Sequence, residues 1–449
     1  MARKKKEIDL PQITHKELVQ QRAIGEIARD AYLDFGGYIN LHRHMADLFG
    51  CKVSYKRLIY AATKFPRGKD IPTTELIASV AAYHPHSLTG LSGLNGTLVK
   101  SGVFTGHGNS YAKISIDGVE SPQSADRYTK TRLSDVYCNV LLDLIKEVEY
   151  EPSPVGALEP KMLPLPLPLC LYLKDVVSGL GVSIKSLYPS FSPKSLYEAY
   201  KANDPMLLEP NVDLLIDKEN SELEKLWRTG KGRVIYSYKI SRQISPDGKT
   251  EGILFEGSTG IFTPNLKKFR KLENENKIFM DNLSDRNGPK LFIGRVPGAR
   301  GITIEEIEDL ARKCCYDSST YMLNVTDGNT AFRIPMYDWL DYTYKNYIDL
   351  VVKVNQKKID KTQFDIAVLE ALPVISDYIL NKNPKASDEE IMRVFGMPQE
   401  IVSSVMSKPI SYLRKNKDTS DRIKELKTRL KELKKFDPVA YTEQIINQL

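Results

Sequence analysis

The dipeptide Arg127-Tyr128 is the first candidate for covalent chemistry in this sequence. A tyrosine hydroxyl has a pKa of about 10, so it is a weak nucleophile unless a base, a metal ion or a cation assists it. The adjacent guanidinium could hold phosphate oxygens during an in-line phosphoryl transfer, and an aryl phosphate ester would preserve the bond for resealing. Because the chain has 24 tyrosines, most of them expected to be packing residues, the dipeptide alone is weak evidence.

A second candidate is the run Tyr83-His84-Pro85-His86. Pro85 has a fixed φ angle and favours extended backbone at His84, so the two imidazoles are held by a stiff backbone. They could bind a metal ion, contact phosphate or act as polar packing residues, and the sequence leaves these alternatives open. A metal site would need further ligands, and no cysteine or glutamate cluster supplies them. We therefore expect no metal site in this chain.

Missing motifs exclude other chemistries. The sequence has no GxxxxGK[ST] loop, and the run GLSGLNG at 90–96 lacks the dinucleotide-binding spacing, so this chain is not expected to bind ATP or NAD. Its five cysteines have no CxxC spacing and are interpreted as free thiols. No cluster of acidic residues suits two-metal chemistry, so a metal ion used in phosphoryl transfer would come from another chain.

Composition sets the class of protein. The 449 residues suffice for about three domains, and 41% hydrophobic with 27% charged residues is typical of globular proteins. A net charge of +7 permits a polyanionic partner without proving one. No apolar run approaches the roughly 20 residues of a membrane helix, and the start MARKKKEIDL is not a secretory signal. We expect a cytoplasmic protein with no membrane partner.

The elements around the candidate residues resemble a DNA-binding unit. An arm with a helix after Pro11 precedes a helix at 52–63 and a second helix, capped by Thr73 or Thr74, that ends before Pro85. Two short helices joined by a glycine-containing turn and flanked by lysine and arginine predict a helix-turn-helix. The glycine-rich, alternating segment at 102–120 predicts a wing, and the stretch 124–148 predicts one helix that begins near Tyr128.

The remainder of the chain changes character twice. The run MLPLPLPLCLYL at 162–173 excludes a helix interior and predicts an extended passage into a second domain. That domain contains a hairpin at 234–257 with the turn PDGK, and helices at 265–277 and 303–314, so it is α+β or α/β. Two apolar series with heptad spacing then predict an antiparallel coiled coil with a small helical knob, or an ordinary helical bundle: Leu340, Tyr344, Tyr347, Val351 and Val354, and Ile423, Leu426, Leu430 and Leu433.

Taken together, these segments resemble the gyrase A and topoisomerase IV A family of type IIA DNA topoisomerases, most closely the short phage medium subunit. CKVSYKRLIYA resembles the family's LKPVHRRVLYA, YHPH is identical, TGHGN resembles DGQGN, and DRYTKTRL resembles MRYTEIRL, in the same order and at similar spacing. Weaker similarity continues through VVSGLGVSI and into the predicted coiled coil. The resemblance covers residues from about 30 to about 435, and is most specific between 52 and 135.

The resemblance implies roles for individual residues. Tyr128 would be the nucleophile and Arg127 the arginine that stabilises the transition state, while His84 and His86 would approach the scissile phosphates. Arg43 is our choice for a further family arginine, although an ungapped alignment places His42 there. The remaining implied DNA contacts are Lys52, Lys56, Arg57, Asn109 and Leu180, the last of which would wedge between base pairs and bend the duplex.

The resemblance also implies an architecture and partners. The fold would be multidomain α+β: an arm at 1–30, a winged-helix breakage-reunion domain at 31–150, an α/β tower at 151–335, and a coiled coil with a dimerisation knob at 336–449. Mg²⁺ and ATP would be bound by a B-type ATPase subunit, in an A2B2 assembly on double-stranded DNA. Without the family's C-terminal β-pinwheel, we expect relaxation or decatenation rather than negative supercoiling.

Two other classes share part of this pattern. A non-enzymatic winged-helix protein that organises chromosomes would have the basic helices and the heptads, but would have no need for Arg-Tyr after HPH and GHGN. A tyrosine recombinase would use a nucleophilic tyrosine, but normally surrounds it with several dispersed arginines and histidines. Trapping of a covalent protein-DNA adduct would separate the three classes.

Overall fold

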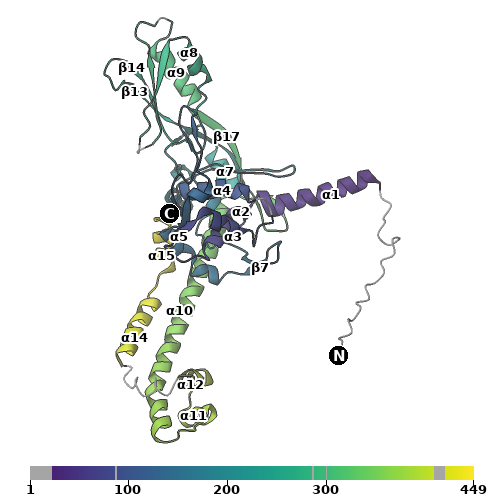
Figure 1. Cartoon of the computed structure of the whole chain (residues 1–449), viewed down its shortest axis with the longest axis vertical. Helices are drawn as coiled ribbons and strands as arrows, with labels where there is room; N and C mark the ends of the chain where they lie inside the picture. Colours follow the sequence, from purple (N-terminus) through teal and green to yellow (C-terminus); the bar gives the residue numbers. More distant parts are fainter. Residues whose placement is uncertain (1–22, 86–87, 286–287, 300, 409–419) are drawn as a thin grey trace, which may run out of the picture.

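The computed structural model of the chain describes residues 23–85, 88–285, 288–299, 301–408 and 420–449. Along the longest axis, Figure 1 shows a central body, a lobe of strands and helices at one end, and long helices that lead away from the body at the other end. α1 (Ile24–Ile39) projects sideways from the body and continues into a short π-helical turn, Asn40–His44. None of the described helices is long and apolar enough to cross a membrane. Most of the arm expected at 1–30 lies outside the described residues.

The first part of the body surrounds the three-stranded sheet β2-β6-β3. The helices predicted at 52–63 and after Thr73 are confirmed, and their apolar residues, such as Leu58, are buried. The predicted threonine cap is wrong, because Pro72 occupies the cap position and makes no side-chain cap bond. The elements are α2 (Val53–Ala62), α3 (Thr73–Val80), α4 (Thr89–Lys100), β2 (Ile71–Pro72), β3 (Phe104–His107), β6 (Lys130–Leu133) and the hairpin β4 (Lys113–Ile114) with β5 (Glu120–Ser121).

The single helix predicted over 124–148 is wrong. Only Asp126–Tyr128 forms a short 3-10 turn, and the chain then runs as β6, the middle strand of its sheet, before α5 (Asp135–Leu141) begins. The β-branched Thr131 suits this position and is fully buried. The start signal of the helix is Ser134, whose side chain accepts a backbone hydrogen bond in the first turn.

The proline-rich run at 162–173 contains no α-helix, as predicted, but only its first part is an extended passage, because Leu169–Leu171 forms a 3-10 turn, and the run lies inside the body. Its leucines alternate with prolines and are almost completely buried. Because proline has no N–H group, this alternation reduces the number of buried donors that need a partner. Gly50 lies against the run, and a Cβ atom on Gly50 would approach the Pro168 Cα atom to 2.2 Å.

Beyond this run, the two large sheets are antiparallel, so the second part of the chain is α+β, one of the two alternatives that the sequence pattern left open. One sheet has the strand order β11-β12-β17-β10-β9 and belongs to the body. Its elements are β9 (Val177–Leu180), β10 (Lys185–Tyr188), α6 (Pro193–Ala202), β11 (Leu215–Ile216), α7 (Leu223–Thr229), β12 (Lys231–Ser237) and β17 (Tyr316–Met322). Short strands complete the body: β1 (Ala46–Asp47), β7 (Tyr150–Pro152), β8 (Leu158–Pro160), β18 (Asn324–Thr326) and β19 (Ala331–Arg333).

The other sheet, β13-β14-β16-β15, forms the lobe at the end of the molecule in Figure 1, and we call residues 239–314 the upper lobe. The hairpin with the PDGK turn is confirmed as β13 and β14, but the residues before Tyr238 belong to β12 in the body sheet. The predicted helices are also confirmed, and Thr303 with Glu306 forms a capping box at the second. The elements are β13 (Lys239–Ile244), β14 (Glu251–Glu256), α8 (Lys267–Asn274), β15 (Ile278–Asn282), β16 (Lys290–Arg295) and α9 (Ile304–Cys314).

The long helix α10 (Met336–Asn381) packs against α14 (Ser420–Lys434) in antiparallel fashion. Asn355 donates to the carbonyl of Leu433 over 3.1 Å, while Lys427 pairs with Glu370, farther along α10. The apolar residues that the heptad spacing predicted to pack, from Ile423 to Leu433, are the least exposed residues of α14. The first half of the α10 series instead packs into the body, where Tyr344 contacts the rings of α6. The knob consists of α11 (Asp388–Phe395) and α12 (Gln399–Met406), and α15 (Pro438–Ile446) returns to the body.

The turn before α2 gives a stability prediction. Gly50 has a φ of +89° and has no room for a Cβ atom, whereas Gly68 has a φ of +76° with open space around it. Gly50→Ala should therefore combine backbone strain with overlap and lower the free energy of unfolding by at least about 2 kcal/mol. Gly68→Ala should show only the smaller strain cost. Urea unfolding of both variants measures the difference, and equal losses would contradict the packing against Pro168.

Asp47, in the same turn, predicts a pH dependence. Its Oδ1 atom accepts from the Cys51 amide over 2.9 Å, and burial raises the pKa of the carboxyl to about 6. A raised pKa gives a stabilising contribution that is complete below about pH 4 and is lost as the pH rises through about 6. Asp47→Asn should thus match the wild type near pH 4 and exceed it by up to about 3 kcal/mol at pH 8. A difference that is constant over this range in urea titrations would refute the assignment.

Candidate active site

Tyr128 ends the 3-10 turn Asp126–Tyr128, and its ring is 70% exposed. The Arg127 guanidinium carbon lies 4.6 Å from the centre of that ring, a distance that allows a cation-π contact. Both side chains are therefore at the surface. A tyrosine hydroxyl that reacts with a polymer must be accessible, and this one is.

The backbone of Tyr128 is fixed although its ring is exposed. The Tyr128 amide donates to the Ala125 carbonyl over 2.8 Å, and the Thr129 hydroxyl donates to the Thr73 hydroxyl over 2.7 Å. The Thr73 amide also donates to the Thr129 carbonyl over 3.1 Å. The first turn of α3 therefore anchors the chain immediately after Tyr128, and the strand β6, which buries Thr131 and Leu133, continues from this anchor.

The segment that precedes Tyr128 is held by Asn109, one of the expected DNA contacts. The Asn109 side chain donates to the Pro122 carbonyl over 2.8 Å, and the Asn109 backbone carbonyl accepts from the Ser124 amide over 2.9 Å. On the other side, the Ser92 hydroxyl donates to Asp126 Oδ1 over 2.6 Å. In this structure the Asn109 side chain thus serves the backbone that leads to Tyr128.

Gly108, in the segment TGHGN, lies directly beside the tyrosine backbone. Its φ is +82°, and a Cβ atom at this position would be 3.2 Å from the Tyr128 carbonyl oxygen. A groove of about 700 Å³ opens between α3, α4 and residues 123–127, and is lined in part by Arg127. The turn therefore has both a close backbone contact and an open groove next to it.

A cluster of charged residues that the sequence pattern did not predict flanks this turn. His107 Nε2 lies 3.2 Å from Asp70 Oδ2, and Arg132 Nε lies 3.2 Å from Asp70 Oδ1, as ion pairs rather than aligned hydrogen bonds. His107 lies opposite Lys130 in the β3–β6 pairing. Because alternate residues of a strand face the same side, Lys130 and Arg132 would have been predicted on one face if β6 had been recognised as a strand.

The basic residues of α2 lie differently from what we expected. The sequence predicts that Lys56 and Arg57 meet phosphates, but both side chains are buried. The Arg57 guanidinium makes a two-bond ion pair with Glu159, over 2.7 and 2.8 Å. The Lys56 ammonium donates to the Lys161 carbonyl over 3.1 Å. In this structure, therefore, neither cation is accessible to a phosphate of a bound DNA.

Arg57 instead contacts His84. Its Nη1 atom lies 3.2 Å from His84 Nδ1, and a guanidinium can only donate hydrogen bonds. Nδ1 must therefore act as the acceptor, which places the proton of the neutral ring on Nε2. Glu159 orients Arg57, and Arg57 sets the tautomer of His84. His84 follows α3 at the end opposite Thr73, so it is separated from Tyr128 by about the length of that helix, roughly 12 Å.

A third group of expected residues gathers at the β9–β10 hairpin. Leu180 is 74% exposed near the end of β9. The Lys52 ammonium donates to the Ser178 carbonyl over 2.7 Å, and burial lowers the Lys52 pKa. Arg43 is exposed on the adjoining π-helical turn. Burial, followed by the charges of Lys52 and Arg43, lowers the pKa of His44 there.

Glycines explain how the hairpin fits against this turn. A Cβ atom at Gly179 would lie 2.1 Å from the His44 carbonyl oxygen, and one at Gly181 would lie 2.0 Å from the Asn40 side-chain oxygen. Asn40 in turn exchanges two hydrogen bonds with the Val182 backbone, of 2.8 and 3.0 Å. These contacts hold Leu180 outwards.

In the single chain, the expected residues that the structure describes thus form three groups: Arg127, Tyr128 and Asn109; Lys56, Arg57 and His84; and Arg43, Lys52 and Leu180. His86 lies outside the described residues. Among the residues that the structure describes, no group of three His, Cys, Asp or Glu side chains could hold a metal ion. An exposed tyrosine with a neighbouring guanidinium and several nearby cations defines a candidate phosphoryl-transfer site.

Comparison with known proteins agrees with this class. The A subunit of DNA topoisomerase 4 from Streptococcus pneumoniae serotype 4 is 22% identical over an alignment that covers 91% of this chain and 49% of the relative. The corresponding protein from Staphylococcus aureus strain N315 is also 22% identical, over 87% of this chain and 52% of the relative. The chain spans about half the length of these curated relatives. No family model matches it. The similarity supports the A-type subunit family.

The buried Arg57–Glu159 pair predicts a large stability effect. Glu159→Gln leaves the Arg57 charge without a counter-ion in the body, so we expect the free energy of unfolding to fall by about 3–5 kcal/mol. The matched control is Glu149→Gln, which removes an exposed partner of Lys161 at 3.4 Å and should change stability by less than about 1 kcal/mol. Urea unfolding at pH 7 tests both, and similar effects of the two variants would refute the role given to Glu159.

Proposed function

We propose that this chain is the DNA-cleaving and religating subunit of a type II DNA topoisomerase. The observation that carries the proposal is the placement of Tyr128, which is exposed, lies beside Arg127 and is fixed through its backbone. Similarity to two topoisomerase 4 A subunits over most of the chain supports it. A packing tyrosine would be expected to bury its ring instead.

In the proposed reaction, the Tyr128 oxygen attacks a phosphorus atom of the DNA backbone. A bond forms between the tyrosine oxygen and phosphorus, the bond from phosphorus to the 3′ oxygen breaks, and the tyrosine proton is transferred so that a 3′ hydroxyl leaves. The product is a 5′-phosphotyrosine. Religation reverses each step: the 3′ hydroxyl attacks the phosphotyrosine, the DNA phosphodiester forms again and the tyrosine hydroxyl is released. Arg127 stabilises the charge on the non-bridging oxygens in both directions.

The described residues do not fit a metal site, because the nearby carboxylates already have partners. Asp126 accepts from Ser92, and Asp70 is paired with His107 and Arg132. We therefore assign Mg²⁺ to a B-type subunit, which would also bind and hydrolyse ATP. ATP would drive passage of a second duplex and would not be needed to form the phosphotyrosine bond.

DNA binding would use the other two groups of residues. His84, with its proton on Nε2, can donate to a phosphate oxygen, and His86 is proposed to act beside it. Lys52 and Arg43 lie beside the exposed Leu180, so that an apolar wedge would be flanked by cations. The direct phosphate contacts expected of Lys56 and Arg57 would require their buried side chains to move, and orientation of His84 is the simpler role for Arg57.

The proposed assembly contains two copies of this chain and two B-type subunits. α11 and α12 would form the dimerisation knob at the end of the α10–α14 pair, and two Tyr128 residues would cut opposite strands. Residues 31–150 would be the winged-helix domain, residues 151–335 the tower and residues 336–449 the coiled coil with its knob. A phage or bacterial source is compatible with this assembly.

Arg127→Ala tests the catalytic assignment. Loss of the guanidinium should leave the dissociation constant for duplex DNA within about threefold, yet slow formation of the covalent adduct about a hundredfold. The measurement is detergent trapping of adducts on labelled plasmid with the cognate B-type subunit, Mg²⁺ and ATP, beside equilibrium binding. Equal losses of binding and of cleavage would contradict the role of Arg127.

Controls for this experiment come from the same chain. Tyr128→Phe should give no adduct, whereas Tyr316→Phe, at another exposed tyrosine of the body, should behave as wild type. Arg67→Ala is the matched control for Arg127, because Arg67 is also exposed in the first part of the body. An adduct formed without the B-type subunit would indicate a recombinase, and DNA binding without any adduct would indicate a non-enzymatic DNA-binding protein.

A further inference from the structure

The hairpin at 113–121 connects the candidate active site to the upper lobe. Its strands β4 and β5 pair at Lys113 with Ser121 and at Ile114 with Glu120, and its tip is closed by hydrogen bonds of 2.9 Å between Ser115 and Val119 and between Gly118 and Ser115. Two strands this short do not form a stable unit by themselves. Their position must therefore come from what they contact at either end.

At the tip, the hairpin is fastened to the upper lobe by side chains from separate elements. Arg270 of α8 donates to the Asp117 carbonyl over 2.6 Å, and Asn282 of β15 donates to the Asp117 carboxylate over 3.2 Å. Thr259 donates to the Ile114 carbonyl over 2.6 Å. Ile116 at the tip is completely buried. The upper lobe therefore holds the tip of the hairpin through three side-chain hydrogen bonds, and burial of Ile116 further restrains the tip.

At the other end, the hairpin leads into the turn of Tyr128 through a segment that is fixed along its length. Asn109 binds the backbone at Pro122 and Ser124. Ser92 accepts a hydrogen bond from the Gln123 side chain and donates one to Asp126. A shift of the hairpin would therefore be passed to the tyrosine rather than absorbed by a loose linker.

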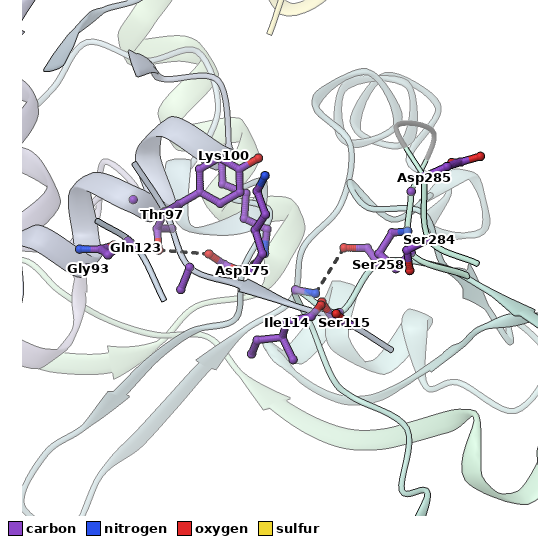
Figure 2. Close-up of a pocket in the computed structure, with 18 residues that line it drawn as sticks. Gly93, Thr97, Lys100, Ile114, Ser115, Gln123, Asp175, Ser258, Ser284 and Asp285 are labelled. Carbon is purple, nitrogen blue, oxygen red and sulfur yellow. Dashed lines mark hydrogen bonds and ion pairs between the residues drawn. The ribbon is translucent and has the colours of Figure 1, made fainter. Parts of the chain in front are cut away.

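A cavity lies beside the hairpin, between α4 and the upper lobe. Figure 2 shows Gly93, Thr97 and Asp175 on one side of it and Ser258 and Ser284 on the other, with Ile114 and Ser115 of the hairpin between the two sides. Its volume is about 660 Å³. This part of the boundary is not filled by packed side chains, so the fastened hairpin is one of the connections that set the upper lobe's position relative to the active site. Another is the hydrogen bond from the Ser258 amide to the Asp213 carbonyl.

We propose that Thr259, Arg270 and Asn282 of the upper lobe are positioning residues for Tyr128, acting through the hairpin at 113–121. They do not touch the reacting atoms. They set where the tyrosine oxygen lies, so a displacement of the upper lobe changes the reactivity of Tyr128. This inference rests on the proposed function for its catalytic consequence, whereas the mechanical connection stands independently of it.

The test is the double variant Thr259→Val/Arg270→Lys in the full chain. Valine removes one hydrogen bond at nearly constant volume, and lysine keeps the positive charge, so electrostatic attraction to DNA is preserved. The matched control is Thr263→Val/Arg242→Lys. Thr263 and Arg242 also belong to the upper lobe, and Arg242 pairs with Glu305 and Glu308 rather than with the hairpin.

Two measurements decide the proposal. In hydrogen exchange, peptides that cover 113–128 should exchange about tenfold faster in the double variant, with α10 unchanged and the control equal to wild type. In detergent trapping, adduct formation should slow at least about tenfold while the dissociation constant for duplex DNA stays within twofold. Unchanged exchange at 113–128, or parallel losses of DNA affinity and adduct formation, would overturn the proposal. A wild type that forms no adduct would refute the proposed function, and the exchange result would still judge the connection.

Discussion

The structure depends on one constraint: Tyr128 must expose its hydroxyl while its backbone stays in place. Packing of the ring cannot provide this order, because the ring is largely in solvent. The order comes from hydrogen bonds on both sides of the residue, to Thr73 through Thr129 and to Ala125 within the turn. The strand β6 then extends the anchor into the core of the body through the buried Thr131 and Leu133.

The same principle operates in the other two groups. His84 is oriented by a buried guanidinium whose own position is set by Glu159. Leu180 is held outwards by glycines that allow the hairpin to lie against the π-helical turn. In the groups of Tyr128 and His84, the residue that would meet DNA is exposed or half-buried, and buried residues such as Thr73, Arg57 and Glu159 help to fix it. This division keeps the geometry precise without covering the reactive surface.

Much of the helical structure could be predicted from the sequence because its signals are local. Apolar residues at helical spacing predict α2, and the Thr303 capping box marks the start of α9. The strand β6 was missed because its evidence is not local: Thr131 is buried by partners on both sides, and these lie far away in the sequence. A run of seven polar residues then resembled the start of a helix.

The candidate site was predictable in its residue types but not in its pairing. The Arg-Tyr dipeptide and the HPH run could be read directly, whereas the burial of Arg57 depends on Glu159, which is 102 residues away. Nothing in a basic helix distinguishes a cation that meets solvent from one that meets a buried carboxylate. The cluster of Asp70, His107 and Arg132 was missed for the same reason, since three separate segments contribute to it.

The identity of the residue that carries DNA tests the central claim most directly. After trapping on plasmid with the B-type subunit, the adduct can be digested with nuclease and protease and the modified peptide identified by mass spectrometry. The account predicts a nucleotide joined through its 5′ phosphate to Tyr128. A nucleotide on any other residue, or one joined through a 3′ phosphate, would contradict it.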